Sequence, residues 1–175
     1  MVLLTSCHET QSQAEYSADE YLEKPINEEY LGHKVDYLIE QRERVRKQFE
    51  KNSILKPVQI SSYDEKLLNN AIEFIDQNLS DPNLSVKRIS KEIGISRVHF
   101  YRKIKSLLSL SPNEFVRTYR IKKAGQLLEQ KKLNVSDARM MVGFNDSDYF
   151  RSCFKKEYGL TPSEFIKKYN GSFGP

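Results

Sequence analysis

The chain has 175 residues, enough for one ordinary domain or for a small domain with a tethered piece of another. Its net charge of +4 conceals an asymmetry: residues 82–170 hold 19 Lys and Arg against 8 Asp and Glu, whereas residues 1–81 hold 9 against 16. No apolar run approaches the roughly 20 residues that span a bilayer, no basic flank marks a secretory signal, and the two cysteines form no close pair. We therefore exclude a membrane span, a disulfide framework and a zinc motif, and expect a cytoplasmic protein whose basic part binds a polyanion.

The N-terminal third predicts two short strands and one long helix. Residues 2–5 and residues 21–25 each read as a short strand, and proline ends the second. From about residue 28 to residue 52, apolar residues recur at spacings of three and four, as in an amphipathic helix. The alternating charges of residues 41–48 indicate that the end of this helix is solvated. Residues 53–62 show no helical period, so we expect a linker there.

Capping residues mark the helices that follow. Polar side chains that can accept hydrogen bonds from free backbone N–H groups open four apolar helical patterns, at Asp64, Ser85, Ser96 and Ser111. The second pattern ends at Gly94, which suits a left-handed stop, and the fourth begins with Ser-Pro-Asn-Glu, a capping box with proline in the first turn. We expect this fourth helix to run to about Gln130, over a length of ~28 Å.

The chain then repeats one pattern. Residues 84–95 reappear 49 residues later as residues 133–144, and residues 100–115 reappear at an offset of 50 as residues 150–165. Each copy contains a helix, a glycine turn and a second helix, which is the helix-turn-helix arrangement, and the second helix of such a unit enters the major groove of DNA. We therefore predict an all-α C-terminal domain over residues 63–170, with two helix-turn-helix subdomains joined by one long connector helix. The ~28 Å connector is comparable with the ~34 Å between successive major grooves.

The first reading helix, residues 96–107, is expected to face DNA with the side opposite its apolar stripe. Arg102 can donate two hydrogen bonds to guanine O6 and N7, and Val98 can pack on a thymine methyl group. Tyr101 can reach a base or a phosphate, or can pack on the helix surface, and both interpretations stay open. Contacts with phosphates are expected from the start of the helix and from two cations: Ser96, Arg97 and Lys105.

The second reading helix, residues 146–158, is expected to do the same with its own outer face. Arg151 is the best candidate for a base contact. Asp148 either accepts a hydrogen bond from cytosine N4 or lies at the favourable positive end of the helix. Ser147 and Ser152 complete the set of residues expected to contact bases. Asn145 and Lys155 complete the set expected to contact phosphates.

Other polar residues receive plainer interpretations. Cys153 is expected to be a small core residue. Four lysines on and after the connector should be solvated: Lys122, Lys123, Lys131 and Lys132. The three histidines do not cluster and no glycine-rich phosphate loop is present, so we predict neither an enzyme nor a cofactor or metal site. A rival hypothesis is a basic protein-interaction module that needs neither Arg102 nor Arg151.

Residues about 64–170 resemble the AraC/XylS-type transcription regulators. The most specific segment is Val142–Pro162 (VGFNDSDYFRSCFKKEYGLTP), which is similar to the signature of that family almost throughout. The resemblance implies a seven-helix fold with two recognition helices in adjacent major grooves of double-stranded DNA. Its base-contacting positions correspond to Val98, Tyr101, Arg102, Ser147, Asp148, Arg151 and Ser152. A contact with RNA polymerase is left open.

Residues 1–52 resemble the tail of a response-regulator receiver domain. Val2–Thr5 looks like the strand that ends in the switch threonine, and Tyr21–Pro25 like the last strand with its switch aromatic residue and Lys-Pro. The phospho-accepting aspartate of that family lies upstream, so we expect no phosphoryl group for Thr5 or Lys24 to sense. We expect a truncated receiver remnant that is poorly ordered or self-associates, then the DNA-binding domain and a tail at 171–175, as at the end of a hybrid two-component regulator.

Overall fold

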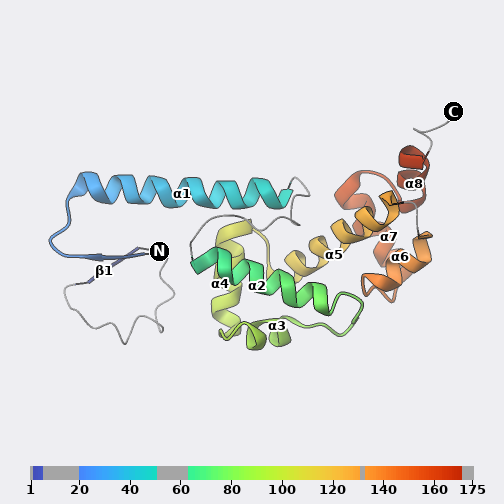
Figure 1. Cartoon of the computed structure of the whole chain (residues 1–175), viewed down its shortest axis with the longest axis horizontal. Coiled ribbons are helices and arrows are strands. Elements are labelled where there is room, and N and C mark those ends of the chain that lie inside the picture. The colour runs from blue at the N-terminus through green and yellow to red at the C-terminus, as the bar shows by residue number, and fades with distance from the viewer. Residues whose placement is uncertain (1, 6–19, 51–62, 131–132, 171–175) are drawn as a thin grey trace.

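The computed structural model describes residues 2–5, 20–50, 63–130 and 133–170 (Figure 1). Two short strands, β1 (Val2–Thr5) and β2 (Glu20–Glu23), pair in parallel, at the two places where the sequence predicts strands. Leu22 of β2 is buried. The predicted linker 53–62, the tail 171–175 and Lys131 and Lys132 lie outside the described residues. None of the helices described is long and apolar enough to cross a membrane.

Helix α1 (Glu28–Glu50) follows the strands and docks by its C-terminal turns on the rest of the chain. Val45 and Phe49 are buried in the core of the first helical unit, and the Phe49 ring lies 5.6 Å from that of Phe115. The prediction of a solvated end to this helix is therefore wrong on one face, because two apolar residues among the charges turn inward. The N-terminal turns of α1 extend beyond the helical units (Figure 1).

The first unit contains helices α2 (Tyr63–Gln77), α3 (Val86–Glu92) and α4 (Arg97–Leu108). Ser85 and Ser96 cap α3 and α4 as predicted, since each hydroxyl accepts a backbone N–H bond from the residue three positions on. Gly94 follows α3 with φ +74°, the left-handed conformation that glycine adopts without strain. Fully buried side chains from all three helices fill the core between them: Ile75, Ile89, Phe100 and Ile104.

The connector helix α5 (Pro112–Glu129) belongs to both units. Its N-terminal turns bury Phe115 and Tyr119 in the first core, and its C-terminal turns bury Ala124 and Leu128 in the second. Buried residues therefore surround much of α5, which explains why it lacks a broad polar face.

The second unit contains α6 (Val135–Met141), α7 (Ser147–Tyr158) and α8 (Pro162–Asn170), which repeat α3, α4 and the start of α5. Asn134 and Asp146 cap α6 and α7, and Gly143, with φ +73°, makes the turn between them. Its core is aromatic: Phe154 contacts Phe165 edge-to-face at 5.2 Å. Residues 63–170, as far as they are described, thus form seven helices, α2 to α8, as the resemblance implied.

Candidate DNA-binding surface

The outer face of α4 presents the residues that the sequence assigned to DNA. Val98 and Tyr101 are 61% and 49% exposed. The polar members of the predicted set are exposed too: Ser96, Arg97, Arg102 and Lys105. The opposite face anchors α4, since Phe100 and Ile104 are fully buried.

Lys103 of the same helix turns inward instead. It is 3% exposed and its Nζ lies 2.8 Å from Asp64 Oδ1 at the start of α2. Its neighbours Arg102 and Lys105 are exposed, and the Lys105 Nζ donates to the Ser109 carbonyl at 3.1 Å. One helix thus carries both an internal ion pair and an outward cationic row.

Helix α7 repeats the exposed row of α4. All six candidates in this region are exposed: Asn145, Ser147, Asp148, Arg151, Ser152 and Lys155. Phe150 and Phe154 are buried and Cys153 is half-buried against the second core, as expected for a small core residue. The Asp146 carboxylate accepts the Tyr149 N–H at 2.6 Å and so fixes the first turn of α7. Asp148 lies in this first turn, so both interpretations of it remain.

Two arginines that the sequence did not single out support α7. Arg139 donates to the carbonyl oxygens of Phe144 and Asn145, at 2.6 and 2.5 Å, and so holds the turn that leads into α7. Tyr149 of α7 acts on Arg117 of α5 and raises the pKa of that arginine. A lone arginine on a helix gives no sequence signal for either contact.

Two connector lysines are not solvated as predicted. Lys122 is 4% exposed and its Nζ lies 3.1 Å from Glu157 Oε1 of α7. Lys123 pairs with Asp76 at the end of α2, at 3.0 Å. Both lysines lie where α5 contacts another helix, so they link elements instead of facing solvent.

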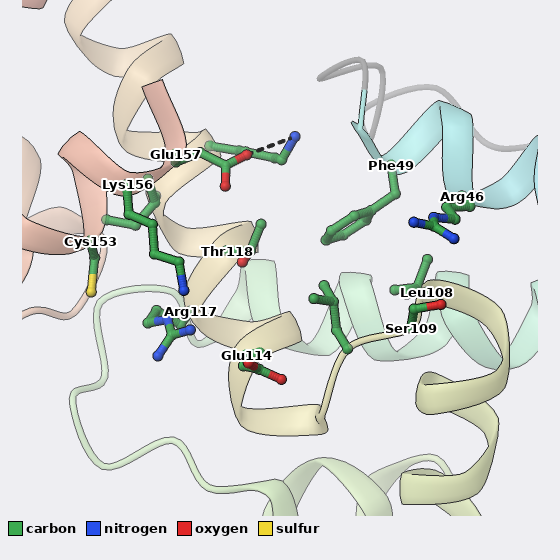
Figure 2. A pocket seen from close by; sticks show the side chains of 13 residues that line it. Arg46, Phe49, Leu108, Ser109, Glu114, Arg117, Thr118, Cys153, Lys156 and Glu157 are labelled. Atoms are coloured by element: carbon green, nitrogen blue, oxygen red, sulfur yellow. Dashed lines mark ion pairs between the residues drawn. The ribbon is translucent and has the colours of Figure 1, made fainter. Parts of the chain in front are cut away.

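A pocket of about 390 Å³ lies where α1, α4, α5 and α7 meet. Figure 2 shows Phe49 and Arg46 of α1 on one side, Cys153 and Lys156 of α7 on the other, and the Lys122–Glu157 ion pair between α5 and α7. Four cations and two carboxylates line it. Among the residues that the structure describes, no three His, Cys, Asp or Glu side chains are grouped closely enough to hold a metal ion.

The chain is similar to known proteins in its helical part. Residues 89–168 match the family described as helix-turn-helix domain. The chain is 36% identical over 161 residues to the protein named Histidine kinase P4 of Formosa agariphila, covering 91% of this chain and 12% of that protein. It spans between 12 and 41% of the first curated relatives that it matches.

Two solved structures share the fold of the helical part. A transcriptional regulator with an AraC-type DNA-binding domain from Chromobacterium violaceum superposes with a TM-score of 0.56 at 26% identity, over 60% of this chain and 93% of that one. The C-terminal domain of AraT, a response regulator from Geobacillus stearothermophilus, superposes with a TM-score of 0.53 at 25% identity, over 58% and 84%.

Proposed function

We propose that residues 89–168 form an AraC-type helix-turn-helix domain for double-stranded DNA binding and transcription regulation. The chain then reads DNA with α4 and α7 in two successive major grooves. One observation carries this proposal. The outer faces of the two helices are exposed at five pairs of positions, each pair 50 residues apart: 97 and 147, 98 and 148, 101 and 151, 102 and 152, 105 and 155.

The chemistry of these positions gives each residue a role. Arg102 and Arg151 donate two hydrogen bonds each to guanine O6 and N7, Val98 packs on a thymine methyl group, and Tyr101 reaches an adjacent base. Asp148 accepts a hydrogen bond from cytosine N4. Ser147 and Ser152 bind donor or acceptor groups on the base edges. Phosphates are bound by a second set, which fixes orientation without reading sequence: Ser96, Arg97, Lys105, Asn145 and Lys155.

Selection from a random pool of duplex DNA, followed by footprinting, tests this proposal. We expect protection of two major-groove segments on one face of the duplex, about one helical turn apart. Arg102→Ala should weaken binding by about 1–3 kcal/mol and relax preference at one base position. Lys66→Ala is the matched control, because Lys66 is an exposed cation on α2.

Protection of a single groove, or binding that does not depend on salt, would contradict the proposal. The interaction module instead predicts little salt-dependent binding of DNA, and binding of an acidic protein that needs neither Arg102 nor Arg151. If Arg102→Ala weakened binding equally on every DNA sequence, we would assign Arg102 to a phosphate contact.

We further propose that the regulator is the output part of a cytoplasmic two-component protein. A parallel strand pair followed by a long helix precedes the DNA-binding units, as in the tail of a receiver domain. Over most of its length, the chain is similar to a protein named as a histidine kinase. Helix α1 would then transmit the upstream signal, since Val45 and Phe49 join it to the core from which α4 projects.

A further inference from the structure

We infer that Arg120 sets the angle and spacing between the two reading helices, by joining the backbones of the two units; this inference rests on the proposed DNA-binding function. Arg120 lies on the connector α5 and is 7% exposed. Its Nη2 donates to the carbonyl oxygen of Asp81 at 2.6 Å, and its Nη1 donates to that of Gly143 at 3.4 Å. Asp81 belongs to the α2–α3 loop of the first unit, and Gly143 to the turn before α7 in the second.

An arginine suits this position chemically. The guanidinium is planar, carries several donors in a fixed fork, and remains charged in a protein interior. Burial lowers the pKa of Arg120 and the nearby Asp81 carboxylate opposes that effect. Two carbonyl oxygens held by one rigid group are fixed relative to each other, whereas a lysine ammonium has no such fork.

The Asp81 carbonyl is presented by a loop that is itself pinned. The Asp81 carboxylate accepts the Asn83 N–H at 2.8 Å and pairs with Arg88 of α3, and both interactions lower its pKa. Asn78 donates from its side chain to the Phe74 carbonyl at 2.9 Å and so ties the start of the loop to α2. These bonds hold the loop in a fixed position relative to α2 and α3.

Gly143 brings the second unit into direct contact with this loop. With φ +73°, a Cβ at this position would lie 2.7 Å from the Leu79 carbonyl oxygen and 3.0 Å from the Arg120 guanidinium. Leu79 packs against both hydrophobic cores. The turn that begins at Gly143 leads directly to α7, so a shift at Arg120 moves the second reading helix.

The sequence suggested that only the connector sets the distance between the two units. In the described residues, Arg120 and Gly143 form a second link between them. A bivalent reader gains affinity when its two modules are preorganised at the separation of their sites, and the gain falls when that geometry is lost. Because Arg120 is buried, we do not expect it to contact DNA. It acts as a positioning residue for α7 relative to α4.

The test uses the full chain and the duplex that it selects from a random pool. Three duplexes are compared: the selected one, one with a single half-site intact, and one with an extra base pair between the half-sites. The extra base pair increases the distance between the half-sites by about 3.4 Å. For Arg120→Met we expect about tenfold weaker binding to the selected duplex and single-half-site affinity within about twofold of the parent. The parent should discriminate against the extra base pair, and Arg120→Met should lose most of that discrimination. Arg120→Lys, which keeps the charge without the fork, should lose part of it and covers the case in which Arg120→Met does not fold.

Arg139→Met is the matched control, because Arg139 also donates to two carbonyl groups, but within one unit. It should weaken the second half-site while the spacing preference persists. Equal weakening of Arg120→Met on single and double half-sites, or an unchanged spacing preference in both Arg120 variants, would overturn the inference. Failure of the parent chain to bind any duplex would overturn the proposed function instead, which is a separate result.

Discussion

Single residues decide how much of the positive charge is exposed on the surface. The basic excess of residues 82–170 indicates a polyanionic partner, yet Lys103, Lys122 and Arg120 are all buried. The two lysines pair with carboxylates of neighbouring helices, whereas Arg120 donates hydrogen bonds to carbonyl oxygens and lies near the Asp81 carboxylate. Counting charges therefore overstates the cationic face, because part of the excess holds the fold together.

A pair of substitutions on α4 separates the two roles of lysine. Lys103→Met removes the ion pair with Asp64 and should cost about 2 kcal/mol in the free energy of unfolding, with the salt dependence of DNA binding unchanged. Lys105→Met loses only the exposed hydrogen bond from its Nζ to the Ser109 carbonyl, so it should cost about 0.5 kcal/mol in the free energy of unfolding and should reduce the slope of log K against log salt by about 0.9. Urea denaturation and binding at several salt concentrations measure both. The same outcome for the two variants would contradict the assignment.

Three glycines with the same backbone conformation should respond differently to alanine. Gly94 and Gly159 have φ +74° and +71°, and the space that a Cβ would occupy at each is open, so each substitution should cost about 1 kcal/mol in the free energy of unfolding. Gly143→Ala adds the collision with the Leu79 carbonyl and should cost about 3 kcal/mol. Urea unfolding of the three variants checks the order. Equal costs would mean that the two units do not touch at Gly143.

At the scale of elements, matching capping boxes begin the helices that follow the two readers. Glu114 accepts from the hydroxyl and N–H of Ser111, at 2.7 and 2.8 Å, and Glu164 does the same with Thr161. These bonds favour the ionised form, so the pKa of each carboxylate lies below its ordinary 4.5. The two boxes fix where α5 and α8 leave the reading helices.

The capping carboxylates give a pH dependence with a definite sign. A carboxylate whose pKa is lowered by folding stabilises the protein fully above its ordinary 4.5 and loses that contribution as pH falls through the lowered value. The free energy of unfolding should therefore decline below about pH 4.5, and Glu114→Gln, which keeps a capping side chain without titrating, should show a shallower decline. Urea unfolding between about pH 6 and pH 3 measures this. Parallel curves for parent and variant would refute it.

For the whole molecule, the two units are expected to behave as one cooperative body. Helix α5 supplies residues to both cores, Leu79 packs against both, and Arg120 joins their backbones. Because α5 packs in both cores, unfolding one unit would expose apolar residues of α5 and remove support from the other unit.

Urea unfolding followed by two probes tests this cooperativity. Far-ultraviolet circular dichroism and the fluorescence of a tryptophan introduced by Tyr169→Trp, at an exposed position on α8, should give coincident transitions for the helical units. Arg120→Met should lower the shared midpoint or separate the two transitions. Two separated transitions in the parent would show that the units are only tethered.

Local signals in the sequence determined the helices and the exposed faces of α4 and α7. Caps at Ser85, Ser96 and Ser111 and the glycine stops lie within a few residues of the feature that they specify, so periodicity and capping chemistry suffice. Only the tertiary structure decided that α1 docks through Phe49, that Lys103 and Lys122 are internal, and that Arg120 bridges the units. Arg120 lies 39 residues from Asp81 and 23 from Gly143, and no helical period encodes a contact at such separations. An arginine on a helix therefore looks the same in the sequence whether it faces solvent, DNA or two backbones.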